Sequence, residues 1–119
     1  MQAGERLPQS YVGLLTDAQG NGKVLVSSLR HGSTITIKMI GPLAPPAQGL
    51  HVLWAVPDSA PPFVLGVLPA QGSAVAQMPG TSEQLLSKVS KLMVTLEPNA
   101  SVAAPSGNIV LQGNCAKLW

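Results

Sequence analysis

The stretch from Leu50 to Gly72, LHVLWAVPDSAPPFVLGVLPAQG, contains two strongly apolar runs separated by the proline-rich segment PDSAPP. Both alternating faces of the first run are largely apolar, which predicts a strand covered on both sides, or covered on one side and open to a partner on the other. The second run is expected to pair with it as the other central strand of a sandwich, with Gly66 beneath Trp54. The two faces of the first run are Leu50, Val52, Trp54 and Val56, and His51, Leu53 and Ala55.

Outward from this pair, short apolar runs alternate with turn residues along the whole chain, a pattern typical of sandwiches and barrels. The sequence therefore predicts an all-β fold, an antiparallel β-sandwich of seven to eight short strands with immunoglobulin-like architecture. At most one short helical turn is expected, near 82–90, with Thr81 or Ser82 as its N-cap. The expected strands are Tyr11–Thr16, Lys23–Leu29, Thr34–Ile40, Leu50–Val56, Phe63–Leu68, Ser73–Met78, Lys91–Glu97 and Asn108–Gln112.

Several connections carry their own signals. Asn21-Gly22 predicts a tight hairpin, because both residues accept positive φ. The prolines of GPLAPPAQG, 41–49, remove the backbone donors that a sheet requires, so this segment is expected to cross to a second sheet. In the strand after the helical turn, alternation places Leu92, Val94 and Leu96 inward, and Met93, Thr95 and Glu97 outward.

Composition excludes several classes of function. The 119 residues include four aromatic side chains, and the seven basic residues are scattered, although nucleic-acid binding needs a basic patch with aromatic residues nearby. No run reaches the ~20 apolar residues of a membrane span, and the N-terminus lacks the apolar centre of a signal peptide. The lone Cys115 makes no internal disulfide and is interpreted as a small apolar residue.

The residues for catalysis are also few. The chain has five carboxylates, and neither histidine lies at zinc-ligand spacing from the other or from Cys115. An enzyme would have to be a metal hydrolase using His31, His51 and Asp58. We therefore expect no enzymatic activity, no cofactor and no metal.

Four short motifs follow one another in a recognisable order. They are HVLWAVP at 51–57, LGVLP at 65–69, LEP at 96–98 and PSG at 105–107. In this order the chain, over roughly 11–113, resembles the C-terminal extracytoplasmic domain of the anti-sigma-K factor family, with serine in place of the family's usual threonine at position 106. The residues that carry the resemblance, expected to be mostly structural, are Leu53, Trp54, Pro57, Leu65, Gly66, Leu68, Pro69, Leu96, Glu97, Pro98, Pro105 and Gly107.

The resemblance implies a layout and a role. Family members have a cytoplasmic segment that holds a sigma factor, then one transmembrane helix, then this domain outside. The chain resembles a fragment that starts just after that helix, with a linker at 1–10, the β-sandwich domain at 11–114 and a tail at 115–119.

The implied function is that of a sensor or regulatory domain on the periplasmic or cell-surface side of a single-pass inner-membrane anti-sigma factor. The implied partners are an extracytoplasmic-function sigma factor, bound through the missing segment, and the proteases that release it. Contact with the membrane is expected only through the missing helix, and contact with nucleic acid is not expected. A homodimer is expected from unpaired sheet edges. The alternative is a free-standing exported β-sandwich module that binds a small ligand or carbohydrate.

Overall fold

Eight strands and one short helix alternate along the chain in the computed structural model, which describes residues 11–29, 32–43, 48–99, 102–106 and 108–117. Six of the strands agree with the predicted ranges to within one residue at each end; the seventh begins two residues earlier and the eighth ends five residues later. The elements are β1 (Tyr11–Thr16), β2 (Gly22–Ser28), β3 (Thr34–Met39), β4 (Leu50–Pro57), β5 (Phe63–Val67), β6 (Ser73–Gln77), α1 (Ser82–Leu86), β7 (Val89–Glu97) and β8 (Ile109–Lys117).

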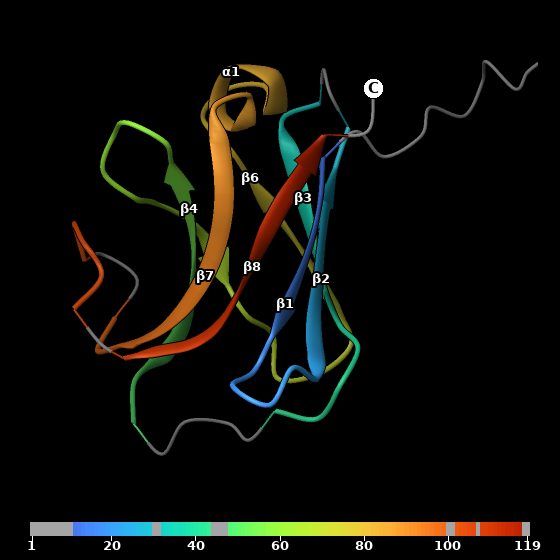
Figure 1. Cartoon of the computed structure of the whole chain (residues 1–119), viewed down its shortest axis with the longest axis vertical. Coiled ribbons are helices and arrows are strands. Elements are labelled where there is room, and N and C mark those ends of the chain that lie inside the picture. Colours follow the sequence, from blue (N-terminus) through green and yellow to red (C-terminus); the bar gives the residue numbers. More distant parts are fainter. Residues whose placement is uncertain (1–10, 30–31, 44–47, 100–101, 107, 118–119) are drawn as a thin grey trace, which may run out of the picture.

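All eight strands belong to one antiparallel sheet in the order β5-β4-β7-β8-β1-β2-β3-β6 (Figure 1). The sheet curls so far that its two edges, β5 and β6, approach each other, which gives a nearly closed, barrel-like sandwich. The prediction of an all-β antiparallel fold is confirmed. The connection after β3 does carry the chain across the fold, but it joins distant positions of one sheet and not two separate sheets.

Gly66 marks the place where β5 and β6 come together. A Cβ built on Gly66 would lie 3.2 Å from both Ala76 Cβ and Ile37 Cδ1, so a larger side chain would push the two edges apart. Gly66 pairs with Leu53 and faces the interior with it, whereas Trp54 points to the other side of β4. The predicted packing of Trp54 over Gly66 is therefore wrong.

Strand β4 is covered on both of its faces by the domain itself. Leu53 and Ala55 belong to the main core inside the curled sheet, and Val52 and Trp54 are equally inaccessible on the opposite face. The apolar character of both faces therefore reflects a strand whose middle, 52–55, is buried on both sides, while Leu50 at its start is 37% exposed. The main core comprises Tyr11, Leu15, Val24, Val26, Ile35, Ile37, Leu53, Ala55, Leu65, Met78, Leu86, Val89, Leu92, Val94, Leu111 and Cys115.

Helix α1 lies over one end of the curled sheet (Figure 1). Thr81 is its N-cap, and a capping box with Gln84 satisfies backbone donors of the first turn. Leu86 enters the core, while the Ser82 hydroxyl bonds to Ser28 of β2 and to the Gly32 carbonyl at 3.0 Å. The predicted short helix is confirmed. No described helix is long and apolar enough to cross a bilayer.

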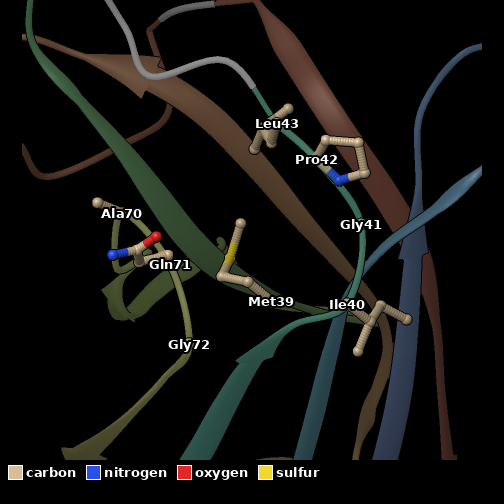
Figure 2. Close-up of a pocket in the computed structure, with 8 residues that line it drawn as sticks. All are labelled: Met39, Ile40, Gly41, Pro42, Leu43, Ala70, Gln71 and Gly72. Atoms are coloured by element: carbon tan, nitrogen blue, oxygen red, sulfur yellow. The ribbon is translucent and has the colours of Figure 1, made fainter.

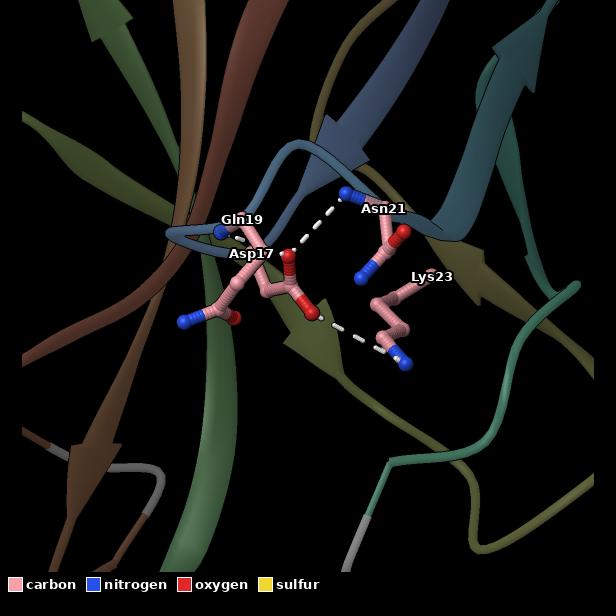
Figure 3. A network of polar contacts seen from close by, with 4 residues as sticks. All are labelled: Asp17, Gln19, Asn21 and Lys23. Atoms are coloured by element: carbon pink, nitrogen blue, oxygen red, sulfur yellow. Dashed lines mark hydrogen bonds and ion pairs between the residues drawn. The ribbon is translucent and has the colours of Figure 1, made fainter.

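The hairpin between β1 and β2 turns differently from the prediction. Gly20, with φ 84°, takes the left-handed conformation, and Gly22 is already part of β2. The Asp17 carboxylate accepts hydrogen bonds from the backbone N–H groups of Gln19, at 2.9 Å, and Asn21, at 3.0 Å (Figure 3). Lys23 Nζ lies 3.8 Å from the same carboxylate. An Asx-type turn therefore replaces the expected two-residue turn at Asn21-Gly22.

Strand β8 continues to Lys117, so residues 115–117, predicted as tail, form part of the sheet. Gly13 pairs with Cys115 and Tyr11 with Lys117. Burial raises the pKa of the Cys115 thiol above its ordinary value of 9.0, although nearby Lys117 opposes that shift. The thiol is therefore protonated near neutral pH, and it packs as an apolar group.

The Asp17 turn predicts a pH dependence of stability. Hydrogen bonding, first from the Asn21 backbone, lowers the pKa of Asp17 below 3.8 in the folded chain. The stabilisation is therefore present above pH 3.8 and is lost as pH falls through the folded pKa. Asp17→Asn, which keeps an acceptor but no charge, should unfold at lower urea concentration than the unaltered chain at pH 7. The two should converge well below pH 3.8, and a difference that persists there would contradict this account.

Candidate functional site

Three of the four sequence motifs meet in one hydrogen-bond network, which is buried at Trp54, Thr95 and Glu97 and reaches the surface at Ser106. Glu97, the last residue of β7, is 1% exposed, and Thr95 is completely buried. The Glu97 carboxylate accepts hydrogen bonds from the Thr95 hydroxyl at 2.6 Å, from the Ser106 backbone N–H at 2.9 Å and from the Ser106 hydroxyl at 2.5 Å. We call this group of Glu97, Thr95 and Ser106 the Glu97 clasp.

The clasp is joined to β4 through an indole. Trp54 Nε1 donates to Thr95 Oγ1 at 2.8 Å, and the Trp54 side chain is fully buried. A buried indole N–H without an acceptor would be costly, so Thr95 satisfies Trp54 while its own hydroxyl proton goes to Glu97. The network thus connects β4, β7 and the segment before β8.

Strand β7 presents the clasp on the face opposite the core. The β7–β8 register shifts between Val94 and Thr95, where the extra residue is Val110 of β8, whereas the pairing of β7 with β4 runs through Val94 and Thr95 without a shift. The alternation of β7 is therefore kept, and Thr95 and Glu97 lie on the face opposite Leu92 and Val94, as predicted. That outer face is buried at Thr95 and Glu97, whereas Leu96, near the end of the strand on the inward side, is 40% exposed. On this face the Glu97 carboxylate meets the backbone amide of Ser106.

Gly49 allows β4 to begin directly beside the clasp. Its φ is 84°, and a Cβ there would lie 2.4 Å from the Glu97 carbonyl oxygen. Glycine is therefore required for two separate reasons, the left-handed backbone and the absence of space. No local sequence signal marks Gly49, because Glu97, the residue that it approaches, lies 48 positions away and is brought near only by the β4–β7 register, in which Leu50 pairs with Glu97.

The other residues of the family motifs have structural surroundings. Leu53 and Leu65 lie in the core and Leu68 packs against it. The Leu68 N–H donates to the His51 carbonyl at 3.0 Å, which extends the β4–β5 pairing. Pro57 ends β4 at a register shift opposite Val89. The remaining prolines of the motifs, Pro69, Pro98 and Pro105, lie outside the strands, and Gly107 lies outside the described residues.

A second feature is an apolar groove at the end of the fold opposite α1. One wall of the groove is formed by residues 40–43, which follow β3, and the other by residues 70–72, which precede β6. The side chain of Met39, the last residue of β3, lies between the two walls (Figure 2). An adjoining hollow of about 200 Å³ is lined by Leu43, Leu68 and the half-buried His51. Burial lowers the pKa of His51 below 6.5, so the neutral imidazole predominates at pH 7. The groove has the make-up of an apolar contact surface without a cluster of reactive groups.

The residues proposed for a metal hydrolase are not brought together. Asp58 accepts a hydrogen bond from Ser90 Oγ at 2.6 Å on the surface, His51 lines the hollow beside the groove, and His31 lies outside the described residues. In the part of the chain that the structure describes, no group of three or more His, Cys, Asp or Glu side chains could hold a metal ion.

The comparisons with known proteins agree with the motifs. The family model described as "Anti-sigma-K factor rskA, C-terminal" matches residues 1–109. The chain therefore belongs to this family, which gives it a regulatory role as part of an anti-sigma factor and, in general terms, a sigma factor as partner. No curated protein and no solved structure matches the chain.

The hydrogen bonds of the clasp predict a loss of stability in a Thr95 variant that keeps the side-chain volume unchanged. Thr95→Val conserves shape but removes the acceptor for Trp54 and the donor to Glu97, and should lower the free energy of unfolding by about 2 kcal/mol. Trp54→Phe should be energetically coupled to Thr95→Val. In a double-mutant cycle by urea denaturation, the loss of unfolding free energy in the double variant should differ by about 1 kcal/mol from the sum of the two single losses. Additive losses would show that the indole and hydroxyl do not interact.

Gly49 and Gly20 form a matched pair, since both have φ 84°. A Cβ on Gly20 meets nothing within 4 Å, whereas one on Gly49 meets the Glu97 carbonyl. Gly20→Ala should cost about 1–2 kcal/mol of unfolding free energy from backbone strain alone. Gly49→Ala should cost about 1–3 kcal/mol more, because the backbone must also move. Equal losses in chemical denaturation would contradict the close approach.

Proposed function

We propose that the chain is the extracytoplasmic sensor domain of a transmembrane anti-sigma factor and that it has no enzymatic activity. In the complete protein, a cytoplasmic segment would hold an extracytoplasmic-function sigma factor. Regulated proteolysis on the domain's side of the membrane would lead to release of the sigma factor. The observation that carries the proposal is the family match over 1–109, together with the convergence of the family motifs on the Glu97 clasp.

The use of polar groups supports a domain that regulates and does not catalyse. Glu97 and Asp17 are committed to hydrogen bonds that hold the domain's own loops, and a buried carboxylate with several donors is well suited to that purpose. The hydrogen bonds of these two carboxylates hold the loops in one conformation, and a signal or a protease would act on that conformation. Self-association through the edges β5 and β6, where Val75 is 68% exposed, stays a prediction.

The alternative of an exported module that binds ligands through aromatic side chains has less support. Such modules display aromatic residues on an accessible face. Trp54 is fully buried here and Tyr11 is 2% exposed, so neither is available to stack on a carbohydrate.

Localisation and partner binding can be tested on the native reading frame. Alkaline phosphatase fused after Lys117 of the complete protein should be active in bacteria, because the enzyme needs disulfides that form outside the cytoplasm. The complete protein should retain a sigma factor in a pull-down, and chain 1–119 alone should not. A reading frame that begins at Met1, phosphatase activity absent from the fusion, or sigma binding by the isolated chain would each overturn the proposal.

A further inference from the structure

The connection between β7 and β8 is the longest between neighbouring elements, spanning residues 98–108. It includes two exposed small residues, Ala103 and Ala104. Endoproteases need an extended, accessible segment, which exposed loops with small residues provide. The connection after β3 is one residue shorter, at 40–49, and those after β1, β4 and β5 have five residues each. The prolines of the β7–β8 connection, Pro98 and Pro105, contribute neither the carbonyl nor the amide of the Ala103–Ala104 bond.

The Glu97 clasp closes this connection at its base. Glu97 precedes the loop and Ser106 lies near its end, and two hydrogen bonds join them. A further backbone bond, from Leu96 N–H to the Asn108 carbonyl, lies beside them at 3.4 Å. Ala103 and Ala104 thus lie in a loop whose two ends are tied, and to fit a protease cleft the loop would have to open.

The strand that follows the loop has a special position. β8 pairs with β7 on one side and with β1 on the other. It is thus the only link between the three strands β5-β4-β7 and the four strands β1-β2-β3-β6 in the order of the sheet. Loss of β8 would divide the sheet into two parts and expose the core between them.

We propose that the 102–105 segment is an endoproteolytic cleavage site, and that the Glu97 clasp both limits access to it and retains β8 after the cut. A protease that accepts small side chains would hydrolyse the Ala103–Ala104 peptide bond with one water, which leaves a carboxylate on Ala103 and an amine on Ala104. Glu97 and Ser106 then lie on different fragments, so the clasp holds the two together. Cleavage and clasp opening together release β8.

The inference specifies the regulation in the proposed function and rests on it for its biological meaning. Its physical content depends only on this chain. Pancreatic elastase, which cuts after small residues, serves as the probe, so failure of the phosphatase fusion would leave the cleavage result intact, and the reverse also holds.

The experiment is limited proteolysis of chain 1–119 under native conditions, with the products identified by mass spectrometry. The first cut should yield fragments 1–103 and 104–119, which stay together in size-exclusion chromatography. Glu97→Gln places an amide N–H₂ against the donors of Thr95 and Ser106, and should accelerate this cut by about 5- to 30-fold, as expected for a loss of one to two kcal/mol of local stability. The cut variant should release 104–119.

Two further variants separate the clasp from general destabilisation. Ser106→Ala removes one donor from the loop and leaves Glu97 in place, so it should accelerate the cut less than Glu97→Gln and still fold. Asp58→Asn alters a surface carboxylate that accepts from Ser90, and should leave the rate at 103–104 unchanged. A first cut outside 102–105, equal rates in the clasp variants and the unaltered chain, or spontaneous separation of the cut unaltered chain would overturn the proposal.

Discussion

The buried carboxylate of Glu97 is the interaction on which the β7 side of the domain depends. A carboxylate that is 1% exposed is tolerated only where hydrogen-bond donors surround it. Here the donors belong to Thr95 and Ser106. Thr95 transmits the interaction to Trp54 and hence to β4, and Ser106 transmits it to the segment before β8. Three parts of the chain that are separate in sequence are thereby held in one register, and the buried middle of β4 has a polar partner on one face.

Much of the fold was predictable because each element has a local signal. Alternation in TITIKM gives β3 with Ile35 and Ile37 buried, and Thr81 with Gln84 gives the capped helix. The family motifs likewise identified Trp54, Glu97 and the segment around Ser106 before the structure placed them together. Since serine and threonine both supply a hydroxyl donor, Ser106 can make the bond that the family's usual threonine would make.

What escaped prediction depends on contacts across the sheet. Alternation places Thr95 and Glu97 on the outer face of β7, but it does not reveal that the segment around Ser106 bonds to that face and that both residues are buried there. The role of Gly49 requires the pairing of β4 with β7, which are not consecutive. A glycine in mid-strand indicates a close approach but not its partner: the curl of the whole sheet brings Gly66 to Ala76 of β6 and not to Trp54 of the neighbouring strand.

The pairing of β1 with β8 has a mechanical consequence. Tyr11 lies opposite Lys117, so the described chain enters and leaves the domain at the same end, the end near α1 (Figure 1). Any tether joined to either terminus would therefore pull from that end. The apolar groove lies at the other end, where β7 also ends, and the described part of the β7–β8 loop stands at the side of the domain (Figure 1). Tension between the two termini would separate β1 from β8 one hydrogen bond at a time, like a zipper, while tension on the loop would load the Glu97 clasp first.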